Sequence, residues 1–164
     1  MTSTYFLHNC LKNIPNYTSV LPIDHLDKIE SWFETYKGQF PKSFVINTEP
    51  SNIESGGHWI LATIFKENKY IAIEIFDSLA LGSDLLPNQL RRQLGQLGKL
   101  NYSNLQIQSY TSDYCGLFCL YRCLSINAGH TLERFYRSFS MTNLNDNDSK
   151  VVTLIENYVQ YIRD

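Results

Sequence analysis

Hydrophobic and polar residues alternate along the middle of the chain with the two-residue period of β-strands. In one segment Ile71, Ile73 and Ile75 share a face, and the segment before it is rich in β-branched and aromatic residues. The polar run KENK at residues 66–69 separates these two segments and predicts a hairpin turn. The pattern predicts four strands, at residues 43–47, 58–65, 70–76 and 104–109.

Elsewhere apolar residues recur every three to four positions, which is the period of an amphipathic helix. The period predicts helices at residues 5–12, 24–36, 87–97, 117–127, 132–138 and near the end of the chain. Asp148 or Ser149 is expected to cap the last helix, and residues 13–22, which contain two prolines, are predicted to be loop. Together these elements predict a single α+β domain over residues 1–164, in which a central helix packs against a small, mostly antiparallel sheet with flanking helices outside.

Charge and hydropathy narrow the function classes. The 164 residues carry a formal net charge of −2, so no overall positive field attracts nucleic acid, and only a local patch could bind DNA. The longest apolar run, at residues 59–65, is far too short to span a bilayer, and the N-terminus does not resemble a signal peptide. We expect a monomeric, intracellular protein that is not secreted and does not bind membranes.

Four cysteines stand at positions 10, 115, 119 and 123. Their spacing matches neither a zinc motif nor a disulfide framework, so we expect reduced thiols, no metal and no other cofactor. Cys119 and Cys123 lie inside the apolar helix predicted at 117–127 and are interpreted as core residues. Cys115 differs, because it stands where that helix begins.

A cysteine at the start of a buried helix is in a reactive position. The first N–H groups of a helix have no partner within it, and the helix dipole places partial positive charge there, so both favour a thiolate. Gly116 leaves room for a substrate backbone to approach the sulfur. Cys115 is therefore the candidate nucleophile, and the chain must also supply a base, a group that orients the base, and donors for an oxyanion.

Among the four histidines, His58 is the best candidate for the base. It opens the strand predicted at 58–65 directly after two glycines, where a side chain can reach into a cleft. If the hairpin turns at 66–69, His58 and Asp77 lie at the same end of the sheet, which makes Asp77 the candidate orienting acid. Glu74, which lies further inside the partner strand, is the alternative.

The oxyanion donor and the substrate cleft also have candidates. The side-chain amide of Gln108 could donate to an oxyanion together with the N–H of Cys115, and Gln106 is the fallback. Trp59 could pack over the imidazole or line the cleft, and with Gly57 it is a candidate substrate-binding residue. Taken singly, each of these residues is more often structural, but their combination supplies every role that a cysteine peptidase requires.

These segments resemble the adenovirus-type maturation proteases (adenain), including the related enzymes of virophages and polinton-type elements, which share a superfamily with SUMO and ubiquitin-like-protein proteases. The resemblance rests on FVINT at 44–48, GGHWI at 56–60, the strand that ends in Phe76-Asp77, and Gln108 followed by CGLFC at 115–119. It implies a papain-like or adenain-like fold, with His58, Asp77 and Cys115 as the catalytic triad and Gln108 as the oxyanion donor.

The chain also departs from the adenovirus enzymes. Those enzymes are longer and basic, often use glutamate as the acid, and are activated by DNA and by a peptide that is disulfide-linked to a cysteine between the acid and the glutamine. This chain is nearly neutral and has no cysteine between residues 11 and 114. Its charge and cysteine pattern therefore do not support a peptide or DNA activator.

The resemblance implies a cysteine endopeptidase that processes viral capsid precursor proteins next to small residues such as glycine. It would act in the virion, or in the cytoplasm or virus factory of an infected cell. An isopeptidase that removes ubiquitin or a ubiquitin-like modifier would use the same chemistry on a diglycine tail. A third hypothesis is a catalytically silent binding module on the same fold, in which Cys115 is an ordinary thiol.

Overall fold

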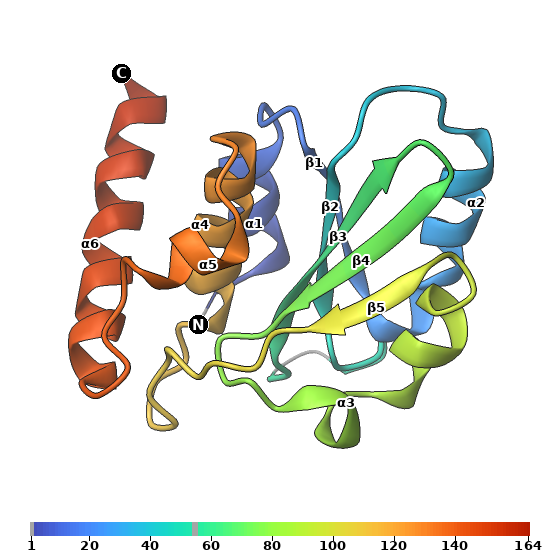
Figure 1. Ribbon diagram of the computed structural model, residues 1–164. Coiled ribbons are helices and arrows are strands. Elements are labelled where there is room, and N and C mark those ends of the chain that lie inside the picture. The colour runs from blue at the N-terminus through green and yellow to red at the C-terminus, as the bar shows by residue number, and fades with distance from the viewer. Residues whose placement is uncertain (1, 54–55) are drawn as a thin grey trace.

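The computed structural model describes residues 2–53 and 56–164 of the chain. Its centre is a five-stranded sheet in the order β1-β2-β3-β4-β5, so strands that follow one another in the sequence are neighbours in the sheet (Figure 1). The strands are β1 (Tyr17–Pro22), β2 (Lys42–Asn47), β3 (Trp59–Glu67), β4 (Tyr70–Phe76) and β5 (Lys99–Tyr102).

The three central strands are antiparallel, as predicted, whereas both edge strands join the sheet in parallel, which was not predicted. β3 pairs antiparallel with β2 and with β4, while β1 runs parallel to β2 and β5 runs parallel to β4. In the β3–β4 hairpin, Leu61 pairs with Phe76 at the end away from the turn. His58, the residue before β3, and Asp77, the residue after β4, therefore lie at the same end of the two strands.

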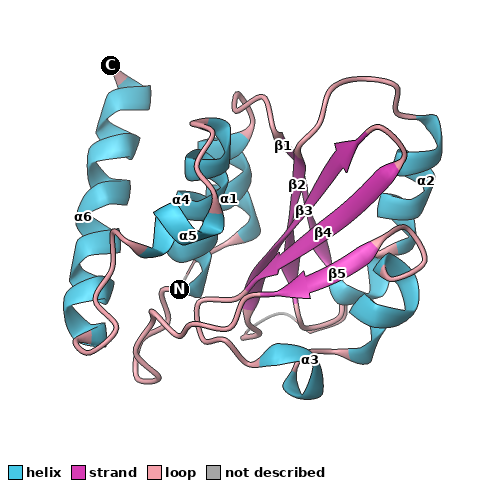
Figure 2. Ribbon diagram, viewed as in Figure 1, coloured by secondary structure: helices cyan, strands magenta, loops and turns pink. Residues whose placement is uncertain are grey.

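Helices cover both faces of the sheet. Figure 2 shows α1, α4, α5 and α6 on one side of the sheet and α2 on the other. The helices are α1 (Thr4–Leu11), α2 (Asp27–Thr35), α3 (Gly82–Leu85), α4 (Cys115–Asn127), α5 (Leu132–Tyr136) and α6 (Leu144–Arg163), with a 3-10 turn η1 (Ile23–His25) and a π-turn η2 (Leu90–Leu94). Within residues 2–53 and 56–164, none of the helices has the length and apolar character needed to cross a membrane.

The sheet buries one hydrophobic layer on each face, because successive strand residues point to opposite sides. In β3, Trp59 and Leu61 pack with residues of α1, α4 and α6, whereas Ile60 and Ile64 pack with residues of α2 and η2. This burial on both sides explains why residues 59–65 form a nearly continuous apolar run instead of an alternating one.

A buried ion pair joins the central helix to the sheet. Arg122 of α4 is 1% exposed, and its Nε and Nη2 donate to the two carboxylate oxygens of Glu74 on β4, at 2.9 and 2.8 Å. Its Nη1 also donates to Ser125 Oγ and to the carbonyl oxygen of His130, each at 3.0 Å. A bidentate pair constrains direction as well as distance, so it holds α4 in one position over the sheet.

The prediction of a strand at residues 104–109 is wrong. The fifth strand is β5, at Lys99–Tyr102, and residues 104–109 are irregular. This segment crosses the end of β4 instead of pairing along it, because the N–H groups of Ile107 and Gln108 both donate to the carbonyl oxygen of Ser78, at 2.9 and 3.1 Å. A strand ladder needs a separate acceptor for each donor, so this segment does not pair as a strand despite its alternation of polar and apolar residues.

The loop predicted at residues 13–22 contains a strand. Tyr17–Pro22 forms β1, which pairs with β2 along one edge of the sheet. Pro22 is the last residue of this strand, opposite Asn47. An edge strand tolerates proline at its end because the missing N–H removes no bond from the interior of the sheet.

Two helices also differ from the predictions. The π-turn η2 replaces the helix predicted at 87–97, and it ends at Gly95, since glycine weakens a helix interior. The last helix begins earlier than predicted, because the side chain of Asn143 accepts a hydrogen bond from the Asp146 N–H and caps α6 there, at 3.2 Å. Asp148 therefore lies inside α6, where its side chain is buried.

Candidate active site

His58 and Asp77 meet at the end of the sheet where strand β3 begins and strand β4 ends. His58 Nε2 lies 2.5 Å from Asp77 Oδ1. The buried Asp77 carboxylate accepts two further hydrogen bonds, from the Leu79 N–H to Oδ1 and from the Leu81 N–H to Oδ2, each at 2.9 Å. The loop after β4 therefore folds back around Asp77 and holds one carboxylate oxygen against the imidazole.

Glu74, the alternative acid, is used elsewhere in the structure. Both of its carboxylate oxygens bind Arg122. It pairs with Thr63 in the interior of the hairpin, away from the end at which His58 lies. Of the two carboxylates, Asp77 is the one that contacts His58.

Cys115 is the first residue of α4, and its sulfur faces the same end of the sheet. Sγ accepts a hydrogen bond from the Trp59 N–H at 3.4 Å, and Cys115 is close enough to His58 to raise the pKa of the imidazole. Because Nε2 of His58 is hydrogen-bonded to Asp77, its other ring nitrogen, Nδ1, is the one left for the sulfur. Carboxylate, imidazole and thiol thus lie in series.

The surroundings of His58 favour its protonated form. Burial lowers the pKa of His58, but the hydrogen bonds to Asp77 and Cys115 and the charges of these two groups raise it by more, so the pKa rises from 6.5 to about 9. The His58 side chain is 16% exposed, which limits screening of these charges by water. At neutral pH the imidazole therefore carries a second proton beside the sulfur.

The Gln108 amide is buried and held from two sides. Its Oε1 accepts from Ser78 Oγ at 2.5 Å, and its Nε2 donates to the carbonyl oxygen of Ser112 at 3.0 Å. Gln106, the fallback donor, turns its amide away and donates to the carbonyl oxygen of Gln108 at 2.9 Å. Of the two glutamines, Gln108 is the one that lines the same cleft as Cys115.

A cleft of about 360 Å³ opens in front of Cys115. The predicted site residues all line it except Asp77, which lies behind His58. Its described lining comes from four parts of the chain: Thr2, Gly56, Gly57, His58, Trp59, Leu79, Leu81, Gln108, Ser112, Asp113 and Cys115. The fold therefore brings His58, Gln108 and Cys115 together, although they are far apart in the sequence.

The backbone at Gly57 needs a glycine. Its φ is +84°, and a Cβ there would lie 2.2 Å from Asn47 Oδ1. His58 and Trp59, which follow Gly57, also line the cleft. The Trp59 ring is buried in the core, and its backbone N–H donates to the Cys115 sulfur. Trp59 therefore contacts Cys115 through its main chain and lines the cleft, which is one of the two positions predicted for it.

Sequence reasoning missed three contributors to the site. Thr2 packs against the start of α4 so closely that a Cβ on Gly116 would lie 2.7 Å from Thr2 Cγ2. Leu79 and Leu81 line the cleft and orient Asp77 through their N–H groups. No pattern in the sequence marks Thr2, since its contact spans most of the chain, whereas the position of the two leucines directly after Asp77 was an available signal.

The comparison of the sequence with known families finds no matching family model, and no curated protein matches it. Solved structures do share its fold. A structure of AvrA delL154 with IP6 and CoA has a TM-score of 0.57 and 19% sequence identity, over 76% of this chain and 47% of that chain. A de-sumoylating protease has a TM-score of 0.50 and 13% identity, over 97% of this chain and 78% of that chain. The ASFV pS273R protease has a TM-score of 0.48 and 13% identity, over 76% of this chain and 55% of that chain.

The likenesses to AvrA and to the de-sumoylating protease establish the fold. The chain has the α+β fold of papain-like and SUMO-protease-like proteins, as predicted, with a five-stranded sheet, flanking helices and a central helix that begins at Cys115. The chain spans about half the length of AvrA and of pS273R. The narrower resemblance to adenovirus-type maturation proteases stays a prediction.

Proposed function

We propose that this protein is a cysteine peptidase in which Cys115 is the nucleophile and His58 the acid and base. The observation that carries the proposal is the arrangement of Asp77, His58 and Cys115 in series, at a helix start and in an open cleft. Burial of a histidine between a carboxylate and a thiol has no evident use in packing, but it is the arrangement that activates a sulfur nucleophile. The likeness to a de-sumoylating protease over 97% of this chain supports the same class of chemistry.

In the first half of the reaction, the Cys115 thiolate attacks the carbonyl carbon of the scissile bond. A C–S bond forms, and the carbonyl π electrons move to the oxygen, which becomes an oxyanion. When the oxyanion collapses, the C–N bond breaks and His58 transfers its Nδ1 proton to the leaving amine. The products are the free amine and a thioester between the substrate acyl group and Cys115.

In the second half, neutral His58 takes a proton from a water molecule, whose oxygen attacks the thioester carbonyl. The second oxyanion collapses, the C–S bond breaks, and the sulfur leaves as a thiolate beside protonated His58. Asp77 holds the imidazole in the orientation that both proton transfers require and stabilises its positive charge. The released product is a carboxylic acid, and the site returns to its starting state.

Two groups are the proposed donors for the oxyanion. The first is the Cys115 N–H, which lies in the first turn of α4, where no side chain caps the helix. The second N–H of Gln108 Nε2 is the side-chain donor. A donor of this kind in a serine protease stabilises the transition state by about 3–4 kcal/mol, so the loss of Gln108 is expected to reduce turnover strongly.

The substrate we propose is a protein cleaved next to small residues such as glycine. The packing of Thr2 on Gly116 leaves little room beside the sulfur, which supports a narrow acyl-binding slot. Following the resemblance to adenovirus-type proteases, the natural substrates would be viral capsid precursors, processed in the virion or in the cytoplasm or virus factory of an infected cell. In this proposal neither a peptide nor DNA is required for activity.

A second candidate is an isopeptidase that releases ubiquitin or a ubiquitin-like modifier. The likeness to a de-sumoylating protease favours it, since that likeness covers almost the whole of this chain. Its substrate would enter as a diglycine tail and occupy the same slot. The chemistry at Cys115 would be unchanged, so the two candidates differ only in the partner protein.

The test is mass spectrometry of a peptide library rich in glycine sites, incubated with the wild type, Cys115→Ala and Cys119→Ala. Cys119 lies one turn further along the same helix and is buried in the core, which makes it the matched control. We expect the wild type and Cys119→Ala to cleave and Cys115→Ala to be inactive. Equal cleavage by Cys115→Ala would refute the nucleophile.

The partner is tested separately with a vinyl-sulfone probe that carries a ubiquitin tail. A thioether on Cys115 would support the isopeptidase, whereas peptide cleavage without probe labelling supports the endopeptidase. If the wild type neither cleaves the library nor reacts with the probe, also after addition of DNA and virion extract, the binding-module hypothesis replaces the proposal.

A further inference from the structure

Ser78 is a fully buried serine directly after Asp77, and it makes two hydrogen bonds to Gln108 and one to Ile107. Its hydroxyl donates to Gln108 Oε1 at 2.5 Å. Its carbonyl oxygen accepts from the Gln108 N–H at 3.1 Å and from the Ile107 N–H at 2.9 Å. One residue therefore constrains both the backbone and the side chain of Gln108.

The carbonyl oxygen of Ser112 selects which way the Gln108 amide faces, and the Ser78 hydroxyl holds the amide in that orientation. An amide can be turned over so that oxygen and nitrogen exchange places, and only its hydrogen-bond partners select between the two orientations. On one side lies the carbonyl oxygen of Ser112, which can only accept, so Nε2 must face it. On the other side the Ser78 hydroxyl donates to Oε1. The opposite orientation would place two acceptors, Oε1 and the Ser112 carbonyl oxygen, against each other.

This orientation leaves a second N–H on Nε2, and no described residue accepts from it. A buried amide with one unused donor is unfavourable unless a ligand accepts from it. Gln108 lines the cleft in front of Cys115, so an oxyanion formed at the sulfur is the available acceptor. The Ser78 hydroxyl thus anchors Gln108 in the one orientation in which Gln108 can act as a donor.

The same short segment also carries the acid. Asp77 and Ser78 follow β4, and Ser103 fixes their backbone, because its hydroxyl accepts from the Asp77 N–H at 2.8 Å and lies 3.2 Å from the Asp77 carbonyl oxygen. The position of Asp77, which orients His58, and the orientation of Gln108 are therefore set by neighbouring residues in one rigid turn.

We propose that Ser78 is a positioning residue for the oxyanion donor: its buried hydroxyl holds the Gln108 amide with Nε2 toward the reacting carbonyl. The inference rests on the proposed peptidase function. It adds a residue that touches no substrate and acts only through Gln108.

A double-mutant cycle tests this, with Ser78→Ala, Gln108→Ala and the double variant assayed on a cleaved peptide. We expect Gln108→Ala to lower kcat by about 10²-fold, as for a lost oxyanion donor. Ser78→Ala should lower kcat by about tenfold, the effect of one buried hydrogen bond, with KM unchanged. The double variant should be no slower than Gln108→Ala, since without Gln108 the hydroxyl has nothing to orient.

Ser103→Ala is the matched control, because Ser103 is also a buried serine that is hydrogen-bonded to this turn but has no hydrogen bond to Gln108. Its effect on kcat should multiply with that of Gln108→Ala. If Ser78→Ala does not fold, Ser78→Cys keeps the shape with a weaker donor and is used in the same cycle, with a smaller expected loss.

Three results would overturn the inference: no loss of kcat in Ser78→Ala, a loss that is repeated in full in the Gln108→Ala background, or a change confined to KM. These results leave the peptidase itself intact, because the wild type still cleaves and Cys115→Ala does not. Failure of the proposed function would instead appear as equal cleavage by the wild type and Cys115→Ala.

Discussion

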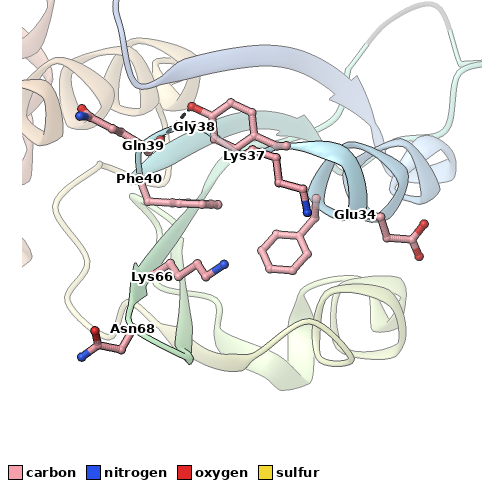
Figure 3. Close-up of a pocket in the computed structure, with 9 residues that line it drawn as sticks. Glu34, Lys37, Gly38, Gln39, Phe40, Lys66 and Asn68 are labelled. Atoms are coloured by element: carbon pink, nitrogen blue, oxygen red, sulfur yellow. Dashed lines mark hydrogen bonds between the residues drawn. The ribbon is translucent and has the colours of Figure 1, made fainter.

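The cavity around Phe33 and Phe40 and the cleft at Cys115 differ in what lines them. The larger cavity, of about 660 Å³, lies at the opposite end of the sheet from Cys115, where Phe33, Tyr36 and Phe40 meet Lys66 near the β3–β4 turn (Figure 3). Lys66 Nζ lies 5.7 Å from the ring centroid of Phe40 and 6.0 Å from that of Phe33, which are cation–π distances at an exposed site. None of its described lining residues is a histidine or a cysteine.

The cleft at Cys115 is about half as large, at 360 Å³ against 660 Å³, yet it holds a nucleophile, a histidine and a buried amide. Its polar groups are hydrogen-bonded to one another, and the partners of His58 raise the pKa of His58 to about 9. Buried polar groups in fixed mutual geometry, and not the volume of a cavity, therefore mark the place where chemistry can occur.

The largest effect is expected when the acid behind His58 is removed. Asp77→Asn should lower kcat on the order of 10³-fold, because the imidazole loses its orientation and the charge that favours its protonated form. The matched change on the same strand is Glu74→Gln, which weakens the buried pair with Arg122. Glu74→Gln should reduce the free energy of unfolding by about 3 kcal/mol and leave kcat nearly unchanged. Kinetics and chemical denaturation of both variants measure this, and a reversed pattern would make Glu74 the catalytic acid.

The pH dependence of turnover tests the role of Asp77 in a second way. Turnover should fall as the pH rises through about 9, the pKa of His58, because neutral His58 has no proton for the leaving amine. In Asp77→Asn this basic limb should move to lower pH, since the hydrogen bond and charge of Asp77 help to raise the pKa of His58. A basic limb at the same pH in both proteins would show that another group controls it.

Protonation of His58 should also be visible in stability. Its pKa is about 9 in the folded protein and near 6.5 in the unfolded chain, so its contribution is fully present below pH 6.5 and is lost as the pH rises through 9. Relative to His58→Gln, which does not titrate there, the free energy of unfolding of the wild type should decline between pH 6.5 and 9. Parallel stability curves for the two proteins would be inconsistent with the raised pKa.

The smallest effect is expected in the larger cavity. Lys66→Ala removes the cation from the aromatic rings of Phe33 and Phe40 but touches nothing in the cleft. Peptide turnover should stay within about twofold of the wild type, and stability should change by less than about 1 kcal/mol, as for exposed cation–π contacts. A tenfold loss of turnover would mean that the larger cavity takes part in the reaction.

Local patterns predicted the parts of the fold that depend on neighbours in sequence. The alternation at residues 70–76 and the polar turn before it predicted β4, and the hairpin register then predicted that His58 and Asp77 share one end of the sheet. The apolar run after Cys115 predicted α4, with a start two residues too late.

Long-range packing decided what local patterns could not. Residues 104–109 alternate like a strand but are drawn across the end of β4 by hydrogen bonds to Ser78, which the sequence does not signal. The approach of α4 to the sheet depends on the Arg122–Glu74 pair. The contact of Thr2 with Gly116 spans almost the whole chain, so nothing near either residue predicts it.

The most direct test of the central claim is to trap the acyl group on the sulfur. An activated ester of a glycine-ending peptide, mixed in excess with the wild type and quenched in acid, is analysed by peptide mapping and mass spectrometry. We expect a burst of about one equivalent of released alcohol and a thioester on Cys115 alone, with a slower burst in His58→Ala. Cleavage without an adduct on Cys115, or with the acyl group on another residue, would contradict it.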